Sequence, residues 1–127
     1  MNNGYNHYHE LNVTLASPER LVVILYEEMA CSVTAAKRAF LADNHKIMNK
    51  YLSKGIEILL ELMSTLNLEA GGAVALQLAD YYQLIIKKIF TLRCQPALEL
   101  FDEVLHLLTP LKEAWESIAV SPFSHTK

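Results

Sequence analysis

The chain has 127 residues, enough for one domain, and its net charge of -3 includes no concentrated basic segment. Without such a segment it lacks the attraction that dominates nucleic-acid binding, which excludes nucleic acid as an expected partner. Hydrophobic residues make up 52% of the chain, yet charges interrupt every apolar run before the roughly 18 to 20 residues of a membrane-spanning helix. We therefore expect no membrane insertion.

The first sixteen residues are polar, rich in Asn, His and Tyr, and show no helical or strand periodicity. We expect residues 1–16 to form a mobile arm that precedes the folded domain. Residues 1–10 lack the basic start and the apolar centre of a signal peptide, so a cytoplasmic location is expected.

Four helices are predicted in the next part of the chain. Ser17 is a good N-cap and Pro18 a good first helical residue, while Asp43-Asn44 can cap the second helix and Gly71-Gly72 forms a corner before the third. Short connections favour an all-α, antiparallel up-down four-helix bundle over residues 17–120, followed by a polar tail at 121–127. The expected helices run from 17 to about 41, from 45 to about 66, from 73 to about 92, and from 96 to about 119.

The apolar faces of the last three helices are wider than a bundle core requires. A helix in a soluble bundle needs an apolar stripe of about 100° or somewhat more, whereas these helices carry arcs of roughly 180° to 200°. The excess surface must be covered by a partner, by self-association or by the arm, because large bare apolar patches are rare on monomers. On periodicity alone, a groove for an amphipathic partner helix and a structural homodimer without a client are equally good interpretations.

Motifs for chemistry are sparse. Glu103 and His106 form a single ExxH unit, but helical metal sites need two such units, and His106 falls on the polar side of its helix. His7, His9 and Glu10 could hold a metal in principle, but they are adjacent residues on the arm without a further partner. We expect no metal, no cofactor and no catalytic residue. Cys31 and Cys94 lie within helical patterns and lack CxxC spacing, which predicts buried, reduced thiols.

Several segments resemble the FliS family of flagellar export chaperones. The resemblance begins at Ala16-Ser17-Pro18-Glu19-Arg20-Leu21 and Ile24-Leu25-Tyr26-Glu27, and continues at the corner Leu66-Asn67-Leu68-Glu69-Ala70-Gly71-Gly72. It extends through Leu78, Tyr81-Tyr82, Glu103-Val104, Leu107-Leu108, Leu111 and Ala114-Trp115. Asn67, Ala73 and Leu84 depart from the family pattern, and the last two lie on the third predicted helix.

The resemblance implies a chaperone that binds the disordered C-terminal segment of flagellin as it becomes helical. Such binding prevents premature polymerisation and presents flagellin to the flagellar type III export gate. A co-chaperone or regulator is a further expected partner, and the free protein is expected to be a monomer or a weak dimer.

The expected client-binding residues lie on the second and third helices, and we expect roughly half of them to belong to the core. They are Tyr51, Leu52, Ile56, Leu59, Leu62, Leu66, Tyr82, Ile85, Ile86 and Ile89. Replacing Ile56 or Leu59 by Asp is expected to weaken client binding more than folding. The resemblance also implies that Tyr5 or Tyr8 can cover part of the groove in the free state.

Overall fold

A computed structural model of the chain describes residues 18–66 and 68–120. These residues form four α-helices and no strand, which confirms the expected all-α class. The helices are α2 (Pro18–Leu41), α3 (His45–Ser64), α4 (Leu68–Cys94) and α5 (Leu98–Val120).

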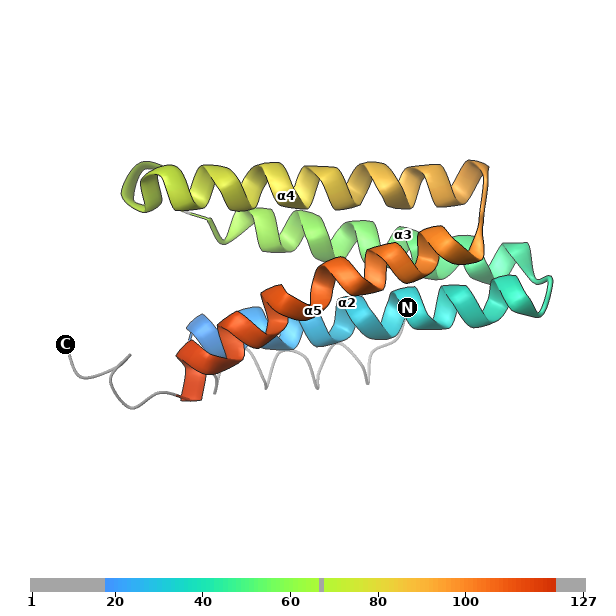
Figure 1. Ribbon diagram of the computed structural model, residues 1–127, viewed down its shortest axis with the longest axis horizontal. Helices are drawn as coiled ribbons and strands as arrows, with labels where there is room; N and C mark the ends of the chain where they lie inside the picture. The colour runs from blue at the N-terminus through green and yellow to red at the C-terminus, as the bar shows by residue number, and fades with distance from the viewer. Residues whose placement is uncertain (1–17, 67, 121–127) are drawn as a thin grey trace.

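Consecutive helices run in opposite directions and pack side by side into a bundle (Figure 1). Helix α2 packs extensively against both α3 and α5, whereas α4 packs less extensively against α3 and α5. The core between the helices is apolar, because each helix turns a stripe of large side chains inward. Its largest fully buried members include Tyr26, Met29, Met48, Leu59, Tyr82, Ile89 and Phe101. Helix α4 is therefore the least firmly held member of the bundle.

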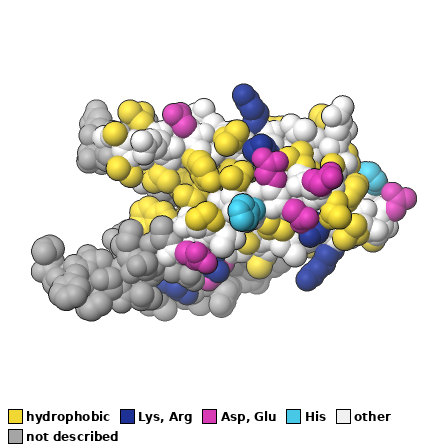
Figure 2. All heavy atoms as spheres, in the orientation of Figure 1, with side chains coloured by type: hydrophobic (Ala, Val, Ile, Leu, Met, Phe, Trp, Pro, Cys, Tyr) yellow, Lys and Arg dark blue, Asp and Glu magenta, His cyan; other side chains and the backbone are white. Residues whose placement is uncertain are grey.

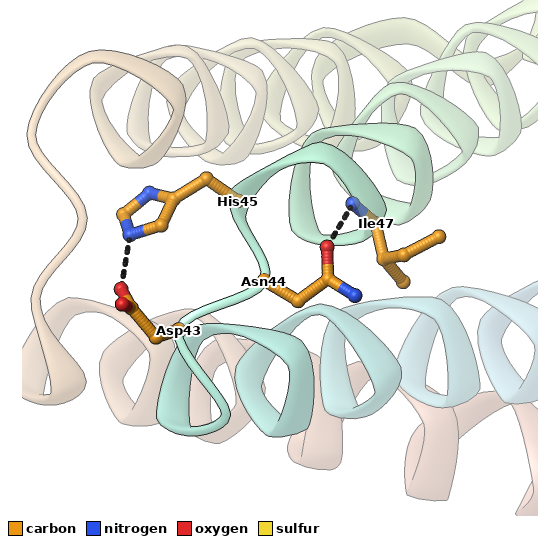
Figure 3. Close-up of polar contacts among 4 residues, drawn as sticks. All are labelled: Asp43, Asn44, His45 and Ile47. Carbon is orange, nitrogen blue, oxygen red and sulfur yellow. Dashed lines mark hydrogen bonds and ion pairs between the residues drawn. The ribbon is translucent and has the colours of Figure 1, made fainter.

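The α2–α3 corner follows the expected capping pattern. The Asn44 side chain accepts a hydrogen bond from the Ile47 amide at 3.2 Å, which satisfies one of the unpaired donors at the start of α3 (Figure 3). Asp43 turns the chain with a positive φ of 60°, a conformation that Asp tolerates better than most residues. Its carboxylate lies 3.2 Å from Nε2 of His45.

Gly72 is the sharp corner expected before the third helix, with φ 58° and ψ -136°. The helical segment nevertheless begins earlier than predicted, because residues 68–71 are already helical before the chain turns at Gly72. The last helix continues through Pro110, although proline cannot donate the amide hydrogen bond to the His106 carbonyl. The second half of α5 lies toward α2 and away from α4 (Figure 1).

The two cysteines are free, as expected, but both are exposed, so the predicted burial is wrong. Cys31 lies two residues beyond the buried Met29 on α2, and at about 100° per residue it faces the opposite side of that helix. Cys94 is the last residue of α4 and lies two residues beyond the buried Leu92. A small apolar side chain in a helical pattern does not by itself indicate a core position.

Candidate functional site

Two buried tyrosines mark the point where α4 is joined to α2. The hydroxyls of Tyr26 and Tyr82 lie 2.5 Å apart and their ring centroids 6.3 Å apart, although the two helices otherwise share few contacts. Burial raises the pKa of both hydroxyls above the ordinary value. The hydrogen bond between them raises the pKa of Tyr26 further and acts in the opposite sense on the pKa of Tyr82, as it does when Tyr26 donates. The indole of Trp115 on α5 acts in the opposite sense on the Tyr26 pKa. Both tyrosines therefore remain neutral, and they share one buried hydrogen bond.

The core-facing side of α4 is covered in the part of the helix that follows Tyr82 and incompletely covered in the part that precedes it. Toward the end of α4, Ile85, Ile89 and Leu92 are fully buried. Toward its beginning, the small Ala75 is still buried, but Leu78 is only half-buried and Val74 is 66% exposed. Val74 and Leu92 are eighteen residues apart, about five full turns, and therefore point in the same direction from the helix. The side of α4 that is core near Leu92 is thus surface near Val74.

This opening arises where α4 and α5 separate. The two helices are close at the short connection between them, where Lys88 of α4 pairs with Glu103 of α5 at 2.7 Å. Further along α5, Leu107, Leu111 and Trp115 pack against the core but are only half-buried. Figure 2 shows a notch between the first half of α4 and the second half of α5, with hydrophobic side chains along its inner edge. We call this surface the α4–α5 notch.

A second apolar surface borders the other side of α4, along its contact with α3. The two helices meet where Gly55 lies against Ile89, since a Cβ at Gly55 would be 3.6 Å from the Ile89 Cδ1 atom. Beside this contact, Ile56 and Ile86 are half-buried, while Leu60 and Phe90 are exposed. We call this strip the α3–α4 seam. Helix α4 is therefore bordered by incompletely covered apolar surface on both sides.

The predicted client-binding residues divide between core and surface. Six of them, on both helices, are fully buried and lie on no open surface of the described structure: Leu52, Leu59, Leu62, Tyr82, Ile85 and Ile89. Four are half-buried and pack against the core: Tyr51, Ile56, Leu66 and Ile86. Of these four, Ile56 and Ile86 belong to the α3–α4 seam. Tyr5 and Tyr8 lie outside the described residues. The division agrees with the expectation that about half of the set belongs to the core.

The residues of the notch were not among the predicted site residues. Val74, Leu78 and Tyr81 of α4 and Leu107 and Trp115 of α5 belong to the wide apolar arcs seen in the sequence, but those arcs give no sign of which turns remain uncovered. Only the separation of α5 from α4 distinguishes them from core residues.

The candidate metal residues do not converge in the described part of the chain. Glu103 is paired with Lys88, and His106 is exposed, as its place on the polar side of α5 predicts. Within residues 18–66 and 68–120, no three His, Cys, Asp or Glu side chains are arranged to hold a metal ion. A pocket of about 210 Å³ lies between α2 and α5 beside Tyr26, smaller than the ~300–1,000 Å³ of typical small-molecule sites.

A helical bundle that leaves the core-facing side of one helix open belongs to the class of proteins that bind an amphipathic partner helix. The sequence matches the family described as "Flagellar protein FliS" over residues 1–122, and the chain belongs to this family. No helix within residues 18–66 and 68–120 has an apolar stretch long enough to cross a membrane.

Three relatives carry the name flagellar secretion chaperone FliS. The protein from Salmonella typhimurium is 30% identical over 87% of this chain and 82% of its own length. The Campylobacter jejuni protein is 27% identical over 92% of this chain and 91% of its own length. The Vibrio cholerae protein is 26% identical over 84% of this chain and 78% of its own length. The function expected from the resemblance agrees with these names, and a structural homodimer without a client is not favoured.

Proposed function

We propose that this protein is a cytoplasmic flagellin export chaperone that binds the disordered C-terminal segment of flagellin and has no catalytic activity of its own. The segment becomes helical as it binds to the α4–α5 notch and the α3–α4 seam. This masks flagellin surface needed for polymerisation and holds the client unfolded for the flagellar type III export apparatus. One observation carries the proposal. Val74 is exposed although it points in the same direction from α4 as Leu92, which is fully buried.

The energetics of such binding favour a surface with several apolar anchor points. Ordering a disordered segment costs about 2 to 5 kcal/mol or more, which the bound contacts must exceed. Each large apolar side chain that becomes fully buried contributes about 1.5 to 3 kcal/mol. A helix with anchors at i, i+3, i+4 and i+7 can bury several of its own side chains together with Val74, Leu78 and Trp115. The combined surface offers enough anchors to exceed the ordering cost.

The proposal is tested by titrating the protein with a flagellin C-terminal peptide in a calorimeter. Saturable binding with a negative heat-capacity change is expected, because apolar surface is buried. Val74→Asp should weaken binding about tenfold or more, since a carboxylate would have to be desolvated in the complex. Val74 is exposed in the free protein, so the variant should fold normally.

Leu41→Asp is the matched control for this experiment. Leu41 ends α2, is exposed to a similar extent (62%), and lies outside both apolar surfaces. This variant should bind the peptide like the unmodified protein. Absence of binding at high micromolar peptide would refute the chaperone function, whereas equal losses in the two variants would refute the role of the notch.

A further inference from the structure

The two halves of α5 are attached to the rest of the bundle very differently. The first half is anchored by buried side chains and by ion pairs to α2 and to α4. The buried side chains are Phe101, Val104 and Leu108, and the ion pairs are Lys37–Asp102 at 2.6 Å and Lys88–Glu103 at 2.7 Å. Beyond Leu108, no side chain that the structure describes on α5 is buried, and Leu111 and Trp115 are half-buried. The second half is therefore held less firmly than the first.

The backbone of α5 is weakest between these two halves. Pro110 has no amide hydrogen to donate to the His106 carbonyl, so this turn of the helix lacks one of its hydrogen bonds. In the same turn, the Thr109 hydroxyl donates to the Leu105 carbonyl at 3.3 Å, an interaction that often bends helices. Prolines are also the commonest sites of sharp helix kinks. Residues 105–110 therefore have the character of a hinge.

Unfilled space lies on both sides of the second half of α5. On the side of α2, the pocket of about 210 Å³ beside Tyr26 is lined by Ala30 of α2 and by Leu108, Thr109 and Lys112 of α5. Packed interiors contain few voids larger than a water molecule, so packing around the hinge is incomplete. On the side of α4 lies the α4–α5 notch, which Figure 2 shows. The segment after the hinge can therefore turn without displacing core side chains.

Trp115 connects the second half of α5 to α2. A hydrogen bond from its side chain lowers the pKa of Tyr26, which places the indole beside the Tyr26 hydroxyl. The same hydroxyl bonds to Tyr82 of α4 at 2.5 Å. Both walls of the notch are thus connected to one residue of α2. A neutral hydrogen bond adds little net stability, so the contact of Trp115 with Tyr26 can be exchanged for contacts with a bound helix.

We propose that the part of α5 after Pro110 is a hinged gate, which turns toward α4 when a client helix occupies the α4–α5 notch and packs Trp115 against that helix. This inference rests on the proposed function. Leu111 and Trp115 are four residues apart, so both move with the gate and stay on one side of it. In the free protein the gate lies toward α2, which leaves the notch open for entry (Figure 1). Pro110 is thereby a positioning residue that acts through Trp115.

Distances between pairs of spin labels test the movement of the gate. Leu76 of α4 and Glu113 of the gate are exposed and become label sites through Leu76→Cys and Glu113→Cys, with the free Cys31 and Cys94 changed to serine. Adding the flagellin peptide should shorten this distance and narrow its distribution. The control pair keeps the label at position 76 and moves the second label to Glu99 in the first half of α5. Its distance should stay unchanged.

Pro110→Ala tests the hinge, because alanine supplies the missing amide and favours an uninterrupted helix. The stiffened α5 should give a narrower distance distribution in the free protein and should bind the peptide about fivefold more weakly. Pro96→Ala is the matched control, since Pro96 lies between α4 and α5 and outside the hinge. This control variant should keep both the distribution and the affinity of the unmodified protein.

Peptide that binds without shortening the distance between positions 76 and 113 overturns the gate and leaves the proposed function intact. Equal shortening in the control pair also overturns it, because α4 would then move as a whole. The hinge is refuted if Pro110→Ala binds the peptide as tightly as Pro96→Ala while both variants keep their helical circular dichroism. Peptide that fails to bind in the calorimeter refutes the proposed function, and the gate with it.

Discussion

At the scale of single residues, the Tyr26–Tyr82 pair shows how a polar contact can sit in an apolar core. Each hydroxyl is buried, and each is the other's hydrogen-bond partner at 2.5 Å. A typical hydrogen bond contributes only about 0.5 to 1.5 kcal/mol to stability, but an unpaired buried hydroxyl costs about 1 to 3 kcal/mol. The hydrogen bond therefore adds little stability, but removing only one of the two hydroxyls would cost more than the bond contributes.

Removing one hydroxyl should consequently cost more than removing both. Tyr82→Phe leaves the Tyr26 hydroxyl buried without this partner, so the free energy of unfolding should fall by about 1 to 3 kcal/mol. The double variant Y26F/Y82F should recover most of this loss, because the site becomes wholly apolar. Urea denaturation of the single variants and the double variant measures the coupling. Additive losses would show that the two hydroxyls do not depend on each other.

The same pair predicts a loss of stability in alkali. Burial raises the pKa of Tyr26 and of Tyr82 in the folded protein, whereas in the unfolded chain both ionise near pH ~10. Their contribution is fully present below pH ~10 and is lost as the pH rises above it, because only the unfolded state releases the protons. The expected loss is about 1.4 kcal/mol per pH unit for each hydroxyl.

Unfolding free energies measured between pH 9 and 11, on the order of one unit on either side of the ordinary tyrosine pKa, test this dependence. The variant Y26F/Y82F is the control, because it keeps every lysine and the four remaining tyrosines but lacks the two buried hydroxyls. Its stability should fall less steeply with pH than that of the unmodified protein. Parallel curves for the two proteins would show that other groups cause the alkaline loss.

At the scale of helices, two glycines have opposite roles. Gly72 has a φ of 58° and forms the corner in α4, and a Cβ there would meet no atom within 4 Å. Gly55 lies inside α3, where a Cβ would make ordinary contacts of 3.5 Å with Met29 and 3.6 Å with Ile89. The first glycine is required by backbone conformation, and the second is required neither by conformation nor by space.

Alanine substitutions at the two positions should therefore shift stability in opposite directions. Gly72→Ala should destabilise the protein by about 1 to 3 kcal/mol, because a φ of 58° combined with a ψ of -136° is strained for an L-residue. Gly55→Ala should stabilise it by up to about 1 kcal/mol through the higher helix propensity of alanine. Thermal denaturation followed by circular dichroism measures both changes. A destabilised Gly55→Ala variant would show that the added methyl group is not accommodated beside Met29 and Ile89.

At the scale of the whole molecule, the helices could be predicted from sequence because their signals are local. The Asn44 cap, the Gly72 corner and the apolar stripes each act within one or two turns of the chain. The open surface is different, because it depends on where α5 lies. Val74 and Leu92 are indistinguishable by periodicity, and only the separation of α5 from α4 leaves the first exposed and the second buried. The sequence therefore predicts that apolar surface is in excess, but not which turns carry it.

The structure changes the expected outcome of substituting Ile56 and Leu59, which the sequence treats alike. Leu59 is fully buried in the core, whereas Ile56 is half-buried beside the α3–α4 seam. Leu59→Asp should reduce the free energy of unfolding by several kcal/mol, because it buries a carboxylate without a counter-charge and removes core packing. Ile56→Asp should cost much less stability and should weaken binding of the flagellin peptide about tenfold, since its side chain borders a surface that the client covers.

Unfolding free energy and peptide affinity must be measured on the same preparations, so that loss of folded protein is not mistaken for loss of binding. Ile56→Ala provides the milder comparison, because it shortens the side chain without adding a charge. If Ile56→Asp lost stability as severely as Leu59→Asp, its half-buried side chain would be core, and the seam would have no share in client binding. Unchanged peptide affinity in a stably folded Ile56→Asp variant would restrict the client to the α4–α5 notch.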